Sequence, residues 1–170
     1  MEQREIDKHI KSRLDLNGDR YHDMHVLNET INMINGCVKE LEQNRRQLCC
    51  DAANEWMANL ERDFPDLEKH GDIRLSKYIM VGVILPYKEY KKGIIVLLEF
   101  IGQDLIYGAT YTDDTKKIRV EMQESDGILP FYKNNEFSKG VDWLFYKSTP
   151  LDIAYDNLKN LIVQMTNKIG

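Results

Sequence analysis

The segment from residue 77 to residue 122 constrains the fold most, because it holds nearly all of the long apolar runs of the chain. Stretches rich in β-branched and aromatic residues alternate there with turn residues, which predicts strands over residues 78–85, 94–101, 104–112 and 116–122. The connections are two to eight residues long, too short for the crossover that parallel neighbours require. The pattern therefore predicts an antiparallel meander.

The first two of these strands are apolar at nearly every position, as in IMVGVIL and IIVLL. Strands of this kind are buried on both faces of a sheet, so we expect helices to cover both sides. Residues 116–122 instead alternate, with Ile118, Val120 and Met122 on one side and charged residues on the other. That alternation predicts an edge strand with one face in solvent.

A helical pattern dominates the part of the chain before the predicted sheet. We expect a short helix over residues 2–14 and a long helix that runs from Met24 to the proline at position 65. The pair Asn35-Gly36 is expected to disturb the long helix, because both residues favour turns.

One face of the long helix carries apolar residues at spacings of three, four and seven. They are Leu27, Ile31, Ile34, Val38, Leu41 and Leu48. This heptad-like pattern has two interpretations. We favour an antiparallel helical hairpin within the chain. The other interpretation is a coiled coil that forms a homodimer through the N-terminal helices, preferably antiparallel because the first 70 residues carry an acidic excess.

The last part of the chain predicts a further strand and a closing helix. Residues 143–147 are a candidate fifth strand, and Thr149 followed by Pro150 predicts a helix start with Thr149 as the N-cap. The apolar face of that helix comprises Leu151, Tyr155, Leu158, Ile162, Met165 and Ile169. We expect this amphipathic helix to cover one face of the sheet.

Together these patterns predict an α+β fold with an N-terminal helical hairpin, an antiparallel meander of four to five strands and a C-terminal amphipathic helix on the sheet. Residues 1–70 are expected to form the helical region, and residues 71–170 the sheet with its helix. A linker over residues 66–72 would join them into one structural unit.

Composition limits the classes of function. The net charge of −5 arises in residues 1–70, while residues 71–170 carry equal numbers of basic and acidic residues. Nucleic-acid binding through a broad basic face is therefore disfavoured. With no apolar run that could span a membrane and no secretory signal, we expect a cytoplasmic protein. The three cysteines lack a metal or disulfide spacing and are expected to be reduced.

Two motifs imitate metal sites, and neither is complete. Residues 15–19 are similar to the start of a calcium-binding loop, but Arg20 stands where that loop requires glycine. His22 and His25 lie three residues apart without a third ligand at a set spacing. We therefore expect no metal and no cofactor.

A third motif imitates a nuclease. Pro65-Asp66 followed by Glu89-Tyr90-Lys91 formally matches the PD…(D/E)xK pattern, in which two carboxylates hold a metal and the lysine assists the attacking water. Those carboxylates must lie on paired strands, whereas Glu89 lies in the polar connection between two predicted strands. We expect the match to be fortuitous.

The same connection carries Lys88, Lys91 and Lys92 beside Tyr90. Cations and aromatic rings in this arrangement can hold a single strand of nucleic acid by charge and stacking. We keep these four residues as a candidate nucleic-acid-binding site, while the neutral balance of residues 71–170 favours ordinary surface residues.

From Trp56 onward the chain presents KGIIVLLEF, DLIYGATY and GVDWLFYKS before a final helix. This order resembles the C-terminal accessory region downstream of the nuclease core in some bacterial and phage proteins of the PD-(D/E)XK nuclease-like superfamily. The resemblance implies an accessory or interaction domain, with the nuclease core outside this chain and no catalytic residue carried over. We therefore expect a non-catalytic accessory or protein-interaction domain. The alternative is a metal-dependent nuclease-related protein or a nucleic-acid-binding module.

Overall fold

The structure is a computed structural model that describes residues 13–14, 16, 18–74, 78–133 and 136–169. The predicted helix over residues 2–14 lies almost entirely outside the described residues, so the helical hairpin stays a prediction. The chain divides into two compact units, residues 1–46 and residues 47–170, and each is described by itself.

The first unit is dominated by the helix α2, which spans Arg20–Asp63 and continues into the second unit. Its start is set by Asp19, whose Oδ1 accepts hydrogen bonds from the backbone N–H groups of Tyr21 at 2.8 Å and His22 at 3.2 Å. These bonds satisfy helix donors that would otherwise lack partners, and they lower the pKa of the Asp19 carboxyl. The helix therefore begins four residues earlier than predicted.

The helix continues through Asn35 and Gly36, so the predicted disturbance at this pair is wrong. Glycine inside a helix costs only about 1 kcal/mol relative to alanine. The helical turns on both sides of Gly36 continue the backbone hydrogen bonds, so the helix is not interrupted. The predicted end is confirmed, because α2 stops at Asp63, two residues before Pro65.

In the second unit, five described strands form one antiparallel sheet in the order β1-β2-β3-β4-β5. The strands are β1 Glu68–Asp72, β2 Ile79–Tyr87, β3 Tyr90–Ile101, β4 Asp104–Tyr111 and β5 Phe145–Ser148. The antiparallel meander is thus confirmed for β2, β3 and β4, and the fifth strand is confirmed one to two residues later than predicted.

The first strand corrects the prediction of a linker over residues 66–72. The sequence EKHGD pairs along β2, with His70 opposite Gly82 and Asp72 opposite Met80. The expected boundary between residues 70 and 71 therefore lies inside β1. A polar strand is tolerated here because β1 lies at the border of the sheet and pairs with β2 along one side only.

Residues 116–122 form no strand, which corrects the predicted edge strand. Asp113–Ile118 form the 3-10 helix η1, and Arg119–Glu124 form the helix α3. The segment buries Thr115 and Met122 and half-buries Ile118, a spacing of three and four that belongs to a helix, while Val120 is exposed. The Thr115 hydroxyl donates to the carbonyl of Gly93 at 2.6 Å and so holds the segment against β3.

The two faces of the sheet have different covers. On one face, Val96, Leu98 and their neighbours on β2 and β4 join the main core with Trp56 and Leu60 from the last turns of α2. On the other face, Ile95, Leu97 and Ile106 form a smaller cluster with Trp143. The helix α2 and the C-terminal helix supply the cover on the first face, as expected. On the second face the prediction of a covering helix is wrong among the described residues, because the cluster there is completed by Trp143, which lies in no helix.

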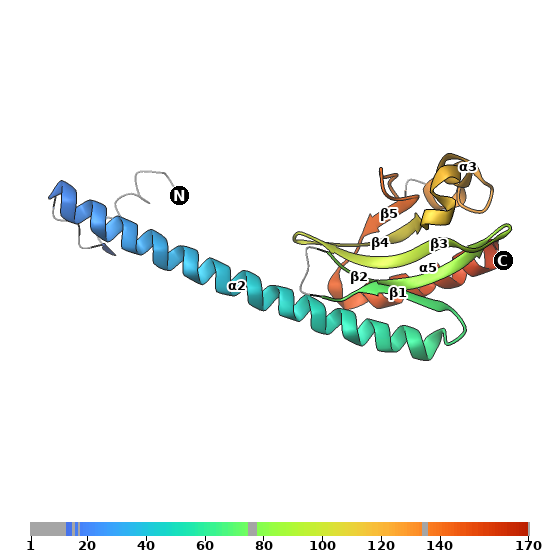
Figure 1. Ribbon diagram of the computed structural model, residues 1–170, viewed down its shortest axis with the longest axis horizontal. Helices are drawn as coiled ribbons and strands as arrows, with labels where there is room; N and C mark the ends of the chain where they lie inside the picture. The colour runs from blue at the N-terminus through green and yellow to red at the C-terminus, as the bar shows by residue number, and fades with distance from the viewer. Residues whose placement is uncertain (1–12, 15, 17, 75–77, 134–135, 170) are drawn as a thin grey trace. The chain divides into compact units, whose positions relative to one another are not determined.

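The C-terminal helix α5 spans Ala154–Ile169 after a short 3-10 helix, η2, at Leu151–Ile153. It packs against β2, β3 and β4 and runs along the sheet (Figure 1). The side chains that it buries are Ala154, Leu158, Leu161, Ile162 and Met165, whereas Leu151 is exposed. A further short helix, α4, spans Pro130–Lys133.

Thr149 is not the N-cap of this helical segment, which corrects the prediction. Pro150 is the capping residue, with extended backbone. The Thr149 hydroxyl instead donates to the carbonyl of Pro150 at 3.1 Å and accepts a hydrogen bond from Asn157 Nδ2 at 2.8 Å. Thr149 is almost fully buried, so its hydroxyl is used inside the fold rather than at the helix end.

Replacement of Gly108 by alanine tests the contact between β4 and β5. A Cβ at this position would meet the carbonyl oxygen of Phe145 and lie 2.7 Å from the Cα of Tyr146. Because both atoms are backbone, β5 must move, and we expect Gly108→Ala to lower the free energy of unfolding in urea by about 1–3 kcal/mol.

Gly36→Ala is the matched control, because a Cβ there would meet no atom within 4 Å. Inside a helix this change removes the conformational freedom of glycine, so it should leave the protein as stable or more stable by up to about 1 kcal/mol. Equal stability of Gly108→Ala and the wild type would contradict the close approach of β4 and β5.

Candidate interaction surfaces

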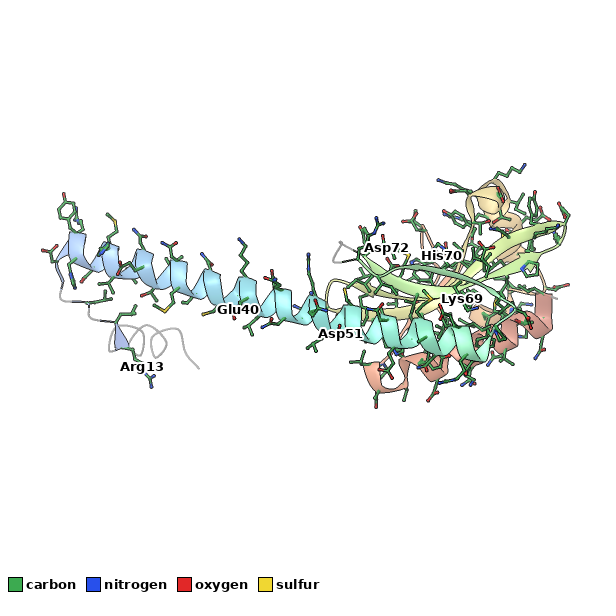
Figure 2. All side chains as sticks on the ribbon, turned by 60° about the horizontal axis from the view of Figure 1, so that its bottom comes forward. Arg13, Glu40, Asp51, Lys69, His70 and Asp72 are labelled. Carbon is green, nitrogen blue, oxygen red and sulfur yellow. The ribbon has the colours of Figure 1, made fainter. Side chains whose placement is uncertain are left out.

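The apolar stripe on the first part of α2 is exposed to solvent. Its members, which we call the seam, are Leu27, Ile31, Ile34, Val38, Leu41 and Leu48. Their exposed fractions range from 38% for Leu27 to 69% for Leu48. Side chains such as that of Glu40 stand out from this part of α2 (Figure 2). Large apolar side chains gathered on one exposed helix face are characteristic of an interaction surface.

The continuous helix fixes the phase of the seam. Because α2 is unbroken, spacings of three and four put all six side chains on one stripe along the helix. Met24 precedes Leu27 by three residues, is 54% exposed and extends the stripe by one position. Met24 was not among the residues predicted for this face, although its spacing of three from Leu27 fits the pattern. Arg45 occupies the position between Leu41 and Leu48.

The helix around the seam is electrically balanced. Between residues 20 and 48 the basic residues are Arg20, Lys39, Arg45 and Arg46, and the acidic ones are Asp23, Glu29, Glu40 and Glu42. His25 Nε2 lies 3.3 Å from the carboxylate of Glu29, one turn along the helix. The acidic excess of residues 1–70 therefore arises elsewhere, and it does not set the charge beside the seam.

The candidate nucleic-acid-binding residues lie together at the β2–β3 hairpin. Lys88 and Glu89 form its two-residue turn, with Lys88 at a positive φ of 52°. Tyr90 begins β3 and is half-buried, and Lys91 is exposed. The structure thus brings together the four residues that the sequence selected.

Long-range ion pairs occupy two of these three lysines. Lys88 pairs with Glu121 of α3, and this bond raises the pKa of Lys88. Lys92 Nζ lies 2.6 Å from the carboxylate of Glu68 in β1. With Glu89 in the turn, three carboxylates accompany the three lysines, so the hairpin carries no net positive charge with which to displace counterions from a phosphate backbone.

The formal nuclease motif is divided between two turns. Asp66 lies between α2 and β1, where it lines an open depression of about 370 Å³ with residues of α5. Glu89 lies in the β2–β3 turn and does not line that depression. Within the described part of the chain, no group of three or more His, Cys, Asp or Glu side chains is arranged to hold a metal ion.

A second open depression, of about 430 Å³, lies on the face of the sheet that carries Trp143's cluster. It is lined by His70, Ile84, Lys92, Ile95, Tyr111, Thr112, Asp113 and Asp114. Burial lowers the pKa of His70 against the opposing effect of Glu68. Along β1, His70 lies opposite Gly82 and Asp72 lies opposite Met80. This depression could not be predicted from the sequence without the strand β1, which contributes His70.

A polar cluster fixes the end of α2 to α5. Lys159 Nζ and the Tyr155 hydroxyl lie 2.6 Å and 3.2 Å from Asp63 Oδ2, and Arg62 Nε donates to Asp63 Oδ1 at 2.9 Å. The hydrogen bonds from Lys159 and Arg62 lower the pKa of Asp63 from 3.8 to about 2. Burial and the nearby Asp63 raise the pKa of Tyr155. The cluster therefore has a structural use within the second unit.

No family model matches the chain, and the searches of curated proteins and of solved structures also return no match. The resemblance to a nuclease-associated accessory region therefore stays a prediction. Among the described helices, none combines the length with the apolar character that crossing a membrane requires.

Protonation of Asp63 should weaken the fold at acidic pH. Because the folded-state pKa lies below the ordinary value, the Asp63 interactions stabilise the protein above about pH 4 and are lost as the pH falls from 3.8 towards 2. We expect Asp63→Asn to lower the urea midpoint at pH 6 and to reduce the dependence of that midpoint on pH between 4 and 2.

Asp66→Asn is the control, because Asp66 is an exposed carboxylate three residues away. It should keep the wild-type midpoint at pH 6 and the wild-type pH dependence. If Asp63→Asn and the wild type lose stability in parallel below pH 4, the cluster does not contribute as described.

Proposed function

We propose that this chain is a non-catalytic interaction module that self-associates through the seam. The observation that carries the proposal is the exposure of all six seam residues on one unbroken helix. The second unit contains its own core and uses the other end of the same helix, through Cys50, Ala53, Trp56 and Leu60, to complete it. In the described part of the chain, the seam is a run of large apolar side chains left exposed to solvent, and a partner that covers them would be stabilising.

The energetics of the seam favour a second helix with the same spacing. Burial of a leucine or isoleucine contributes about 1.5–3 kcal/mol when it is complete, and a paired helix offers knobs and holes that match those of the seam. Loss of translational and rotational freedom opposes association, so several residues must act together. A second copy of the chain has this matching spacing, so self-association is the form of interaction that we propose. A different protein with a helix of the same spacing could bind the seam in the same way.

The hairpin supports the non-catalytic part of the proposal. Lys88 and Lys92 are engaged by Glu121 and Glu68, and the carboxylates of the formal nuclease motif lie in separate turns. An accessory domain of the kind that the sequence resembles would also lack catalytic residues. We further propose a reducing, cytoplasmic setting, in which Cys37, exposed on α2, stays a thiol.

Self-association should depend on the seam and not on the charge of the helix. We expect the wild type to sediment as a dimer of the 20.0 kDa chain at micromolar concentration, and Ile34→Asp to sediment as a monomer because a buried carboxylate without a partner is costly. Near-UV and far-UV circular dichroism should confirm that the second unit stays folded in Ile34→Asp.

Met33→Asp is the matched control, because Met33 is exposed on the same helix one residue away from Ile34 and lies off the seam. It introduces the same charge and should leave the dimer intact. A wild type that stays monomeric at all micromolar concentrations would refute the proposal, and so would equal dissociation by the two aspartates.

Incubation with plasmid and single-stranded DNA in Mg²⁺ or Mn²⁺ tests the non-catalytic assignment. We expect no cleavage, and no salt-sensitive binding that Lys91→Glu abolishes, since the hairpin carries as many carboxylates as lysines. Cleavage that Glu89→Gln removes would instead establish the nuclease alternative. Binding at low salt that Lys91→Glu removes would establish the nucleic-acid-binding one.

A further inference from the structure

The phase of α2 divides the seam into two alternating sets of positions. Counting from Met24, the spacing alternates strictly between three and four residues as far as Leu48. The first set, at the heptad position called a, comprises Met24, Ile31, Val38 and Arg45. The second set, at position d, comprises Leu27, Ile34, Leu41 and Leu48.

The residue types in the two sets differ in shape. The a set contains the β-branched Ile31 and Val38, and the d set contains leucine at three of its four positions. In parallel coiled coils, β-branched residues at a and leucine at d pack best in two strands, because the two layers present different angles to the facing helix. The distribution therefore favours a parallel pair over an antiparallel one, in which a and d would share layers.

We infer that the partner of the seam is a second copy of this chain, aligned parallel and in register. The inference rests on the proposed self-association and specifies its geometry. In this arrangement each seam residue faces the same residue of the second copy, from Met24 to Leu48.

Arg45 selects the register. In the parallel, in-register pair the two Arg45 residues share one layer near the end of the seam, where their aliphatic stems cover apolar surface and their charged ends reach water. A shift by one heptad would place one Arg45 against Val38 and the other against Ala52. Antiparallel overlap of the whole seam would place each Arg45 against Leu27. Both alternatives put charge into two layers instead of one, so a single polar a position specifies the alignment.

The positions beside the seam accept this alignment. In a parallel pair Thr30 faces Asn35 of the second copy and Cys37 faces Glu42, so neither contact brings like charges together. The acidic excess of residues 1–70, which disfavours a parallel pair when the region is considered as a whole, is absent from these contacts. Local side-chain identity thus outweighs regional net charge, because exposed charges interact weakly beyond about 10 Å in salt.

The parallel alignment has a functional consequence. The chain after Leu48, which makes up nearly all of the second unit, follows the seam in each copy, so the two copies of that unit continue from the same end of the coiled coil. Two copies of any surface on that unit would then act together on one target, which raises the effective affinity of that surface. An antiparallel pair would separate them by the length of the seam.

Cysteine cross-linking tests the alignment in the full-length chain. In a Cys37→Ser background, Leu41→Cys and Leu27→Cys each place a thiol at a d position. In the inferred pair, the new cysteine of one copy faces the same cysteine of the second copy. The separation there suits a disulfide, which needs Cα atoms about 4.4–6.8 Å apart. We expect each variant to form a disulfide-linked dimer under mild oxidation, and Met33→Cys, which lies off the seam, to form little.

A mixture of Leu41→Cys with a size-tagged Ile31→Cys separates the alternatives, because antiparallel overlap of the whole seam puts residues 41 and 31 in one layer. A mixed disulfide, without disulfides of Leu41→Cys or Leu27→Cys to themselves, would overturn the inference and leave the proposed dimer intact. Absence of all of these cross-links in a protein that sediments as a dimer would also overturn it. A wild type that sediments as a monomer would end the proposed function and the inference together.

Discussion

The double burial of β3 is the constraint on which the second unit depends. Residues 94–98 are buried at every position, so the sheet needs apolar partners on both sides at once. On one side α5 and the last turns of α2 supply them, with Trp56 stacked on Phe100 at a ring distance of 5.6 Å. On the other side Trp143 supplies the cover from a segment near β5. The positions of α5, of the last turns of α2 and of Trp143 therefore follow from the burial of β3.

The same constraint explains why α2 changes character along its length. Cys50 is 5% exposed, whereas Leu48, two residues earlier, is 69% exposed. The buried side chains after this point repeat at helical spacing, as do the seam residues before it, but they lie on a stripe that is rotated around the helix. One helix thus carries two apolar surfaces, of which the sheet uses one.

The sequence pattern predicted the elements whose own residues form a strong hydrophobic pattern, namely β2, β3, β4 and the final helix. It failed where distant residues decide. The strand β1 is polar and exists through pairing with β2, and the helical conformation of residues 116–122 depends on Thr115, which reaches Gly93. Alternation over 116–122 satisfied the strand pattern equally well, since Ile118 and Met122 have a spacing that fits either structure.

The candidate surfaces also divide into one that local sequence pattern predicts and one that distant residues determine. The spacing of the seam was visible in the sequence, because it needs only a continuous helix. The neutral charge of the hairpin was not visible, because Lys88 and Lys92 find their partners 33 and 24 residues away. A cluster of lysines in a sequence therefore indicates a basic surface only when the fold brings no carboxylates to it.

The short, polar strand β1 also affects how copies of this chain can assemble. It borders the described sheet, spans five residues and carries Glu68, Lys69, His70 and Asp72. An open sheet border normally invites another strand, and repeated addition at such a border gives fibres of unlimited length. A brief border rich in charge resists that addition. Growth by extension of the sheet beyond β1 is thereby discouraged.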